Sequence, residues 1–398
     1  MTARSKLAII CSHPIQYYAP LFCSLATRAE LELQVFYTWS QRSAGAAYDT
    51  GFAREFAWDV PLLQGYPYRF VANIARRAGT DHFFGLRNPE LIPAIEAWKP
   101  HAVLIFGWPY YSHLQSLCHF KGRIPVLFRG DSTLLDPVSP LRRSARRAVL
   151  RWIYRHIDIA IAVGQSNRDY YLWCGVPSSR VLFAPHAVDI DRFADDGGQQ
   201  RERADSWRLR LGIAPEEVAI VFAGKFQPKK DPLLLLQAYG CMRDADRQAA
   251  HLIFVGDGVL EGRLRERASR HSNVHFLPFQ NQSVMPAVYR LGDLFVLPSR
   301  GPGETWGLAL NEAMASGRAV IAGSRVGAAR DLVRDGTTGW TFPSGDLPAL
   351  ASVLAAALAL GRQGLHAVGA EGRRLIGSWS MAECAAGIVE AVRAAIRV

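Results

Sequence analysis

Cysteine is scarce in this sequence and follows no pattern. Six cysteines are scattered over 398 residues, with no C-x-x-C pair and no group of histidines and cysteines at metal-ligand spacing. A disulfide framework and a structural zinc site both require such spacing, so the sequence excludes both. The thiols are expected to be reduced, as in a cytosolic protein.

A long apolar run is missing from the N-terminus. The apolar run LAIICS follows MTARSK and stops at His13 and Pro14. A signal peptide needs a longer apolar stretch, and a membrane-spanning helix needs about 20 apolar residues. The sequence therefore predicts a cytoplasmic protein, with any membrane contact peripheral and at the inner face.

Acidic residues are too few to balance the basic ones. The chain has 46 Lys and Arg against 35 Asp and Glu, which gives a net charge of +11. Nucleic acid, acidic lipid and phosphate-bearing small molecules are all anionic partners that fit this charge. No helix-turn-helix, zinc-finger or RNP pattern supports the first of them, so no nucleic-acid partner is predicted.

The rest of the sequence is typical of an α/β protein. Its 398 residues predict two domains, because single cores stop growing near roughly 250–300 residues. Short apolar runs alternate with helical patterns such as Leu233–Tyr239 and Leu260–Ser269. Runs that are apolar on both faces are typical of parallel strands between helical layers. We expect strands at Leu7–Ser12, Leu33–Trp39, His101–Gly107, Pro125–Asp131, Ile157–Gly164, Arg180–Pro185, Val218–Lys225, His251–Gly256, Val274–Phe279, Asp293–Ser299, Arg318–Gly323 and Gly339–Pro343.

A polar, charged segment over Asp189–Ala214 separates the two series of strands and is predicted to be a linker. We therefore expect two doubly wound, Rossmann-like domains that face a central cleft. The first covers residues 1–190 and is completed by a C-terminal helix over 380–398; the second covers 191–379. In such sheets ligands bind beyond the carboxyl ends of the strands.

The stretch 294-LFVLPSRGPGETWGLALNEAMASGRAVIAG-323 predicts a buried strand, a Gly/Pro loop and a helix over Glu304–Ser316. The amino end of such a helix favours a phosphate. Glu304 and Glu312 would lie on roughly the same side of it, about 12 Å apart. A carboxylate can accept two hydrogen bonds from a diol such as ribose. The plainer alternative is a helix with one N-terminal acid and one surface glutamate, which the apolar residues around Glu312 disfavour.

A second polar site follows an earlier strand, in 218-VAIVFAGKFQPKKDPLLLLQAY-239. Lys225 comes directly after Gly224, and Lys230 stands just before the next helix. Two ammonium groups in one strand-end loop can neutralise a departing diphosphate. Lysines in loops are ordinarily solvated, so the two lysines alone indicate little. They become informative because they precede Glu304 and Glu312 in the sequence.

That order resembles family 4 of the retaining GT-B glycosyltransferases, also called glycosyltransferase group 1. The resemblance rests on G-K-x-x-x-x-K, on VGDG at Val255–Gly258, and on E-x7-E within GLALNEAMASG. The segment 185-PHAVDIDRF-193 is similar to the family's P-N-G-V-D-x-x-x-F junction, with His186 and Ala187 in place of Asn-Gly. The match extends from about Pro185 to Gly345.

The resemblance implies roles for single residues. The second domain would bind a nucleotide sugar, with the diphosphate held by Lys225, which stands where the family usually has Arg, and by Lys230. Glu304 would contact the transferred sugar and Glu312 the ribose. The other implied donor contacts are Gly224, the strand-end backbone at Phe279 and Gln280, and the backbone at Thr305, Trp306, Gly307 and Leu308.

The first domain, which would bind the acceptor, resembles the family only in architecture, although 12-SHPIQYYAPLF-22 is similar to a bacterial subset. The family's His after the fourth strand is replaced here by 127-LFRGDST-133. The acceptor-side candidates are His13, Gln16, Trp108, Tyr110, Arg129 and Asp131. A helix-capping histidine and ordinary half-buried aromatic positions explain several of them equally well.

The predicted function is retaining transfer of a hexose-type sugar from a UDP- or GDP-sugar to a saccharide or lipid-linked saccharide, in bacterial surface polysaccharide or glycoconjugate synthesis. Front-face attack is the mechanism that the resemblance implies; double displacement through Glu304 or Asp131 stays open. A nucleotide-sugar epimerase and an inactive nucleotide-sugar binding protein are the alternatives. No cofactor and no essential metal are expected, because no further carboxylates complete an oxygen cage around the D-x-D pair Asp189 and Asp191.

The segment 140-PLRRSARRAVLRWIYRHID-158 carries six arginines before its first acid. Val149, Leu150, Ile153 and Ile157 recur at helical spacing on one side. Such a helix either docks on an anionic membrane or packs by its apolar stripe and leaves the charges in water. The second interpretation is the favoured one.

Overall fold

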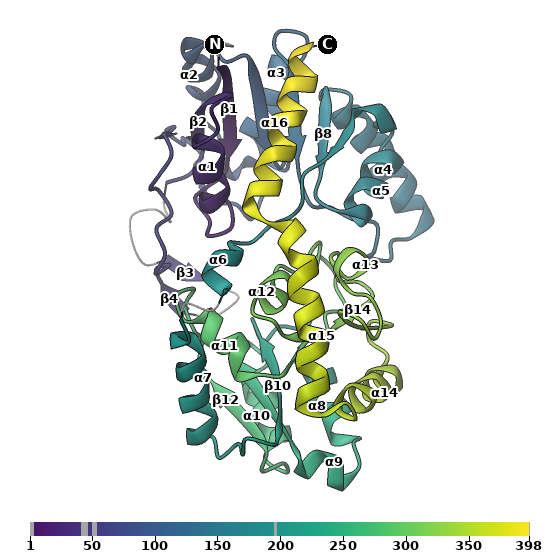
Figure 1. Cartoon of the computed structure of the whole chain (residues 1–398). Coiled ribbons are helices and arrows are strands. Elements are labelled where there is room, and N and C mark those ends of the chain that lie inside the picture. Colours follow the sequence, from purple (N-terminus) through teal and green to yellow (C-terminus); the bar gives the residue numbers. More distant parts are fainter. Residues whose placement is uncertain (1–3, 41–46, 50–53, 195–196, 398) are drawn as a thin grey trace. The chain divides into compact units, whose positions relative to one another are not determined.

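The computed structural model describes residues 4–40, 47–49, 54–194 and 197–397. The chain divides into two compact units (Figure 1). Unit 1 comprises Met1–Ala47, Val60–His186 and Met381–Val398, and unit 2 comprises Tyr48–Asp59 and Ala187–Ser380. Each unit is built around its own parallel sheet, so the prediction of two doubly wound α/β domains is confirmed. The described residues 48–49 and 54–59, predicted to lie in the first domain, belong to unit 2.

The sheet of unit 1 has seven strands in the order β5-β2-β1-β6-β7-β8-β9. All its pairings are parallel. The six strands predicted in this half are present, and the edge strand β5, three residues long and without a buried residue, was missed. The strands are β1 (Ser5–Cys11), β2 (Leu31–Tyr37), β5 (Tyr68–Phe70), β6 (Ala102–Phe106), β7 (Val126–Arg129), β8 (Ile159–Ala162) and β9 (Val181–Phe183).

The helices of unit 1 alternate with these strands and include the last helix of the chain. That helix, α16 (yellow in Figure 1), packs on β6 to β9 and on α1 through a face that includes Cys384, Ile388 and Val392. The helices are α1 (Ala19–Ala26), η1 (Phe83–Gly85), α2 (Leu91–Trp98), α3 (Tyr111–Phe120), α4 (Pro140–Tyr154), α5 (Gln165–Trp173), η2 (Ser178–Arg180) and α16 (Met381–Arg397).

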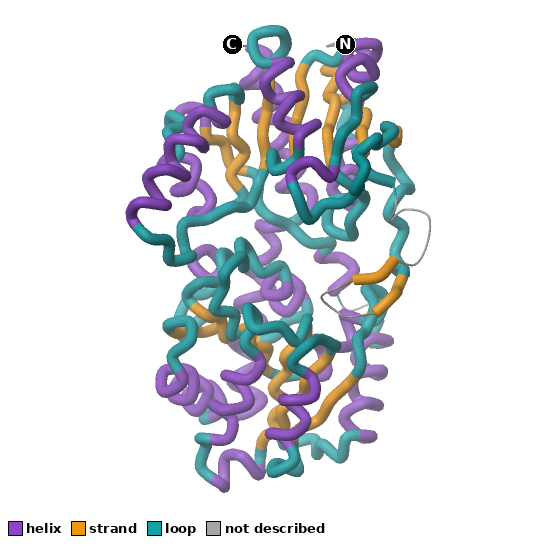
Figure 2. The backbone as a smooth tube through the Cα atoms, turned by 180° about the vertical axis from the view of Figure 1, so that it is seen from behind, coloured by secondary structure: helices purple, strands orange, loops and turns teal. Residues whose placement is uncertain are grey.

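The sheet of unit 2 has six strands in the order β12-β11-β10-β13-β14-β15, again all parallel. A separate two-stranded sheet joins β3 (Ala47–Asp49) to β4 (Arg54–Phe56). Figure 2 shows the strands of both sheets in orange. The six main strands, all predicted, are β10 (Val218–Ala223), β11 (Ala250–Val255), β12 (Val274–Leu277), β13 (Leu294–Leu297), β14 (Ala319–Gly323) and β15 (Gly339–Phe342).

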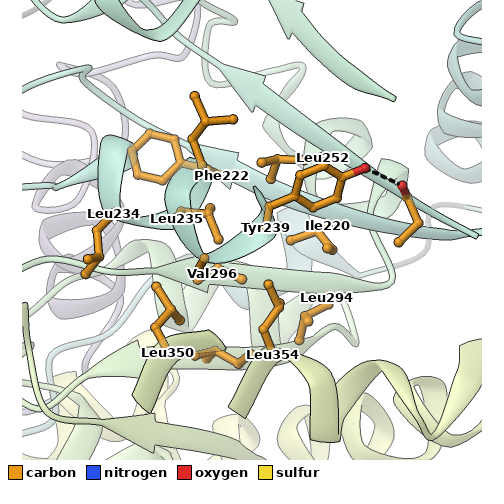
Figure 3. Packing of buried hydrophobic residues seen from close by; sticks show 14 of the residues in the cluster. Ile220, Phe222, Leu234, Leu235, Tyr239, Leu252, Leu294, Val296, Leu350 and Leu354 are labelled. Atoms are coloured by element: carbon orange, nitrogen blue, oxygen red, sulfur yellow. Dashed lines mark hydrogen bonds between the residues drawn. The ribbon is translucent and has the colours of Figure 1, made fainter. Parts of the chain in front are cut away.

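The core of unit 2 lies between this sheet and helices on its faces. Figure 3 shows Leu235 and Tyr239 of α8 and Leu350 and Leu354 of α14 gathered around strand residues such as Ile220. The Tyr239 hydroxyl donates to the Ala250 carbonyl at 2.8 Å, which satisfies its polar end. The helices are α6 (Ile190–Phe193), α7 (Gln199–Arg210), α8 (Pro232–Gly240), α9 (Asp244–Gln248), α10 (Glu261–Ala268), α11 (Met285–Leu291), α12 (Ala309–Ala315), α13 (Ala329–Leu332), α14 (Leu347–Leu358), α15 (Gly361–Ile376) and η3 (Gly377–Trp379).

The predicted linker over Asp189–Ala214 is not a plain linker, because α6 and α7 lie within it. α7 was missed since most of its surface is polar. It is held by Arg208, which is buried and pairs with Asp293 at 3.0 Å. This ion pair, the bonds of Arg208 to the Leu291 and Glu217 carbonyls, and packing on α11 together attach the helix to unit 2.

The C-terminal stretch Gly361–Arg397 is long and apolar enough to cross a membrane by length and composition alone. In the structure η3 interrupts it between α15 and α16. Each helix buries an apolar face in its own unit, for example Leu365 in α15 and Ile388 in α16. Core packing accounts for this composition.

Candidate active site

The predicted donor residues of unit 2 lie where the strand order reverses. β10 pairs with β11 on one side and with β13 on the other, so the crossovers diverge between β10 and β13. In doubly wound sheets ligands bind at the carboxyl end of such a switch point. The loop after β10 carries Lys225 and Lys230, and the loop after β13 carries Glu304.

Lys230 and Glu304, 74 positions apart in the sequence, form a close ion pair. The Lys230 ammonium lies 2.8 Å from Oε1 and 2.7 Å from Oε2 of Glu304. Ser299, the residue where the strand run ends, donates its hydroxyl to Oε2 at 3.1 Å. Glu304 is only 8% exposed, so water screens this pair weakly. The structure thus fixes a cation and an anion side by side at the switch point.

A second set of contacts ties the same two loops together. The backbone N–H of Arg300 donates to the Lys229 carbonyl at 3.0 Å, and its guanidinium lies 3.3 Å from the Asp231 carboxylate. Burial raises the pKa of Asp231, and the nearby Arg300 charge opposes this. Asp231 has a left-handed backbone with φ of 50°, which is uncommon for a residue with a side chain. These contacts hold Lys230 against the β13 loop.

Glycines of the VGDG motif let the strand-end loops approach one another. A Cβ at Gly256 would lie 2.2 Å from the Gly224 carbonyl oxygen, and one at Gly258 would lie 2.8 Å from Phe226 backbone atoms. Between these glycines, Asp257 accepts from the Phe226 N–H through its carbonyl at 2.9 Å. Its carboxylate accepts from the Phe279 N–H at 3.2 Å. Asp257, which sequence reasoning passed over within its own motif, therefore links the loops after β10, β11 and β12.

The helix predicted from Glu304 begins later than expected. α12 covers only Ala309–Ala315, so Glu304 lies in the preceding loop and the two glutamates do not share one helix. Gly307 has φ of +94°, a value that an α-helix does not allow. A Cβ at Gly327 would lie 1.7 Å from the Thr305 carbonyl oxygen, which shows how closely a second segment supports this loop. The predicted helix start at Glu304 is therefore wrong: this residue precedes α12 by more than a turn, so the helix amino end that was expected to favour a phosphate does not lie at Glu304.

Glu312 and Trp306 are buried side chains. Glu312 is 2% exposed and accepts a hydrogen bond from the Tyr289 hydroxyl at 2.6 Å. The Trp306 indole N–H donates to Asn311 at 2.9 Å, and its ring packs 5.2 Å from that of Trp379. Only the backbone of Trp306 fits the predicted donor contact. Lys225, Phe279, Gln280, Thr305 and Leu308 are half-buried in the same strand-end region.

Four acceptor-side candidates of unit 1, His13, Gln16, Trp108 and Tyr110, also flank a switch point, between β1 and β6. His13 follows β1; its Nδ1 lies 3.0 Å from the Ser12 hydroxyl, and its ring contacts Trp39 edge-on at 5.6 Å. Gln16 is half-buried in the turn before α1. Trp108 and Tyr110 follow β6, where Trp108 packs partly against the core.

Arg129 of unit 1 is a structural residue. It is buried, and its guanidinium donates to the carbonyls of Ala184 and Pro185 at 2.9 and 3.0 Å. It also lies 3.4 Å from the Cys384 sulfur on α16. Arg129 thus joins the end of β7 to the chain beyond β9 and to the last helix, while Asp131 lies half-buried two residues further on.

A buried histidine next to this switch point was missed. His113 of α3 lies 2.8 Å from the Gly107 carbonyl through Nδ1 and 3.2 Å from the Thr38 hydroxyl through Nε2. Burial lowers its pKa to about 4, so the ring is neutral at pH 7. The available signal was its helical spacing from Leu117 and Phe120, which lie on the buried side of α3. Its contacts make it a fixed support of the loop that carries Trp108 and Tyr110.

Residues 217–359, which contain the donor-side residues Lys225, Lys230, Glu304 and Glu312 of unit 2, match a family model described as Glycosyl transferases group 1. The chain carries a domain of this family. The recognition drawn from the lysine and glutamate pattern is therefore confirmed. A D-inositol 3-phosphate glycosyltransferase of Geodermatophilus obscurus is 34% identical over 238 residues, which are 57% of this chain and 49% of that protein. The chain thus spans about half the length of the curated relatives it matches.

Solved glycosyltransferase structures match nearly the whole chain. HepE of Anabaena in complex with UDP has a TM-score of 0.72 at 17% identity and covers 98% of this chain and 100% of that one. Sucrose-phosphate synthase of Thermosynechococcus elongatus has a TM-score of 0.69 at 18% identity, with 98% and 99% covered. At such identities these likenesses show the fold, and the GT-B fold class predicted from the sequence is confirmed.

Proposed function

We propose that this protein is a retaining, metal-independent glycosyltransferase that moves a hexose-type sugar from a UDP- or GDP-sugar to a saccharide or lipid-linked saccharide. The acceptor would be one used in surface polysaccharide or glycoconjugate synthesis. The observation that carries the proposal is the Lys230–Glu304 pair, held by Ser299 at the switch point of unit 2. The relative named for D-inositol 3-phosphate and the HepE structure named for UDP support a transferase that uses a nucleotide sugar.

The pair provides the two charges that such a transfer needs. The donor diphosphate gains negative charge as its bond to the sugar breaks, and Lys230 and Lys225 would stabilise that charge. Glu304, fixed by three contacts to Lys230 and Ser299, would accept hydrogen bonds from sugar hydroxyls. Glu312 would accept from the ribose while its Oε2 keeps the hydrogen bond from the Tyr289 hydroxyl, because a carboxylate can accept several hydrogen bonds.

In the proposed reaction the acceptor oxygen forms a bond to the anomeric carbon while the bond from that carbon to the diphosphate oxygen breaks. Both events occur on one face of the sugar. The acceptor proton passes to the departing phosphate oxygen, so no protein base is required. A covalent intermediate on Glu304 is disfavoured, because both of its oxygens are engaged by Lys230 and the resulting charge neutralisation makes the carboxylate a poor nucleophile.

Ligand-induced stabilisation tests this proposal. In a thermal-denaturation panel of UDP, GDP, ADP and their sugars, UDP or GDP should raise the melting temperature most. A ligand at 100 times its Kd adds about 2.7 kcal/mol to the stability of the native state. That is roughly 5–10 °C for a domain of this size. In the described part of the chain no group of three His, Cys, Asp or Glu side chains is placed to hold a metal ion, and we expect the same shifts in EDTA.

Product analysis separates the alternatives. The preferred nucleotide sugar, incubated with saccharide and lipid-linked acceptors, should give a glycosylated product with retained anomeric configuration. Formation of an epimeric nucleotide sugar without an acceptor would replace the transferase by an epimerase. Binding with neither product across the acceptors would favour an inactive binding protein, and an absence of any nucleotide-dependent shift would contradict the donor site itself.

A further inference from the structure

Helix α4 of unit 1 has two apolar stripes, and only one of them is buried. Leu150, Ile153 and Tyr154 pack into the core of the unit. On the opposite side, Leu141 is 82% exposed, Val149 55% and Trp152 42%. At 100° per residue these three fall, together with the exposed Ala145 and Ala148, within about 100° of one another around the helix. The exposed residues therefore form a continuous stripe, which we call the outer stripe: Leu141, Ala145, Ala148, Val149 and Trp152.

Arginines border the outer stripe on both sides. Arg143 and Arg147 turn toward the Trp173 ring of α5, at 5.7 and 5.8 Å, and so belong to the inner side of the helix. Three arginines flank the outer stripe on the exposed surface: Arg142 lies on one side of it, and Arg151 and Arg155 lie on the other. The Arg155 guanidinium lies 5.7 Å from the Trp152 ring. No acidic residue occurs in α4, so the charges that the helix itself contributes are all positive.

We propose that the outer stripe of α4 docks on an anionic lipid surface. An exposed Trp and Leu row between arginines is the arrangement that lies at the boundary between headgroups and acyl chains. Charge selects this occupant over a second copy of the chain. A symmetric contact would place the arginines of both copies against one another, whereas acidic headgroups neutralise them.

Co-sedimentation with lipid vesicles tests the docking. The full chain should bind mixed vesicles of phosphatidylglycerol and phosphatidylcholine at low salt and bind them more weakly at high salt. It should not bind vesicles of phosphatidylcholine alone. Absence of binding to the anionic vesicles at low salt would overturn the proposal. Equal binding to both kinds of vesicle would overturn the role of the arginines.

Matched variants assign the binding to this helix. Leu141→Ser combined with Trp152→Ser should lower partitioning about tenfold or more, because both side chains enter the lipid boundary. Leu209→Ser is the control, since Leu209 of α7 is 81% exposed and lies outside the stripe. Arg142→Ala with Arg155→Ala should weaken binding to a similar degree, whereas Arg263→Ala with Arg267→Ala on the exposed side of α10 should not.

Three outcomes would contradict the docking on α4. One is wild-type binding by the Leu141/Trp152 variant, and another is an equal loss in both arginine pairs, which would indicate net charge alone. The third is a wild-type dimer that the Leu141/Trp152 variant converts to a monomer, which would make the stripe an interface between copies. Unchanged circular dichroism and melting temperature in each variant show that it has folded.

A different observation concerns the segment 54–59, which precedes most of unit 1 in the sequence but belongs to unit 2. The Phe56 ring lies 4.6 Å from the Phe279 ring and 4.8 Å from the Trp58 ring. The Asn281 amide donates to the Ala57 carbonyl at 2.7 Å, and the Asp59 carboxylate accepts from the Ser283 N–H at 3.0 Å. The segment thus straps the loop after β12.

We infer that this strap positions the loop that recognises the nucleotide base, with Phe56 as a positioning residue. The inference rests on the proposed function, in which the backbone at Phe279 and Gln280 contacts the base. Phe279 is held from one side by the bond of its N–H to Asp257 and from the other by the Phe56 ring. Without the ring, the carbonyl and N–H groups at this strand end would lose a fixed orientation toward the base.

Separate binding of base and phosphate tests the strap. The ligand to use is the nucleoside diphosphate that raises the melting temperature of the wild type most. Phe56→Ala should lower the affinity for this ligand about tenfold, while inorganic pyrophosphate binds both proteins alike. Phe84→Ala, at an exposed phenylalanine of unit 1, is the control. Equal nucleotide affinity in wild type and Phe56→Ala, or an equal loss for pyrophosphate, would overturn the strap. A wild type that no nucleotide stabilises would instead remove the proposed function.

Discussion

Lys230→Ala is expected to lower kcat roughly 10²–10³-fold, the usual effect of removing one preorganised charge stabiliser from a transition state. The donor KM should change far less, because the interaction strengthens only as the diphosphate develops charge. Lys229→Ala is the matched control, since Lys229 contributes its backbone carbonyl to the junction of the two loops. Initial rates over a range of donor concentrations measure both parameters.

The same substitution leaves Glu304 buried without its cation, so a loss of activity alone does not separate chemistry from folding. Removing one partner of a buried ion pair costs about 3–5 kcal/mol. The double variant Lys230→Met with Glu304→Gln removes both charges and should recover much of the melting temperature while turnover stays lost. Recovery of turnover together with stability would show that the pair is structural, and near-normal turnover in Lys230→Ala would remove the diphosphate assignment.

The sequence could predict the strands because they are apolar on both faces. That pattern depends on burial between two helical layers and not on any particular partner, as Ile220 and Val296 show. It fails for β5, whose three residues are exposed or half-buried, and for α7, a mostly polar helix attached through the buried Arg208 and through packing on α11. Elements that are buried on all sides can be predicted from the local sequence. Elements that depend on tertiary contacts with distant residues cannot.

In the candidate site, too, some features follow from the sequence pattern and others depend on distant contacts. The approach of Lys230 to Glu304 was foreseeable because parallel strands bring their end loops to one edge. The loop state of Glu304 was not, because the sequence around it has helical spacing. A Cβ at Gly307 would lie 2.7 Å from Val326 and 3.0 Å from Leu297, so the tertiary packing at this positive-φ residue leaves no room for a side chain. Likewise, the helical spacing in the sequence placed Val149 and Leu150 on one apolar side of α4, and only tertiary contacts decide that Leu150 is buried and Val149 exposed.

Asp293→Asn is expected to destabilise unit 2 by about 3–5 kcal/mol at pH 7, because it leaves Arg208 buried without a counter-charge. The Asp293 carboxylate, 1% exposed, also accepts from the Ala219 N–H at 2.9 Å and pairs with Arg362 and His366 at 3.0 and 2.9 Å. It thus ties α7, β10 and α15 together. Asp246→Asn is the control, an arginine-paired carboxylate at the surface whose loss should change stability little. Denaturant midpoints of the three proteins measure the effect.

The pH dependence of this difference identifies charge as its cause. Burial alone would raise the pKa of Asp293, but the hydrogen bond from His366, the charges of Arg208 and Arg362 and the Ala219 N–H together hold it well below its usual range. A depressed pKa stabilises the native state above the unfolded value of about 3.9, and that contribution is lost as the pH falls below it. The gap between wild type and Asp293→Asn should therefore be constant from pH 7 to about 5 and shrink below about 4. A gap that stays constant down to pH 3 would mean that the asparagine disturbs packing or hydrogen bonding and that the ion pairs contribute little.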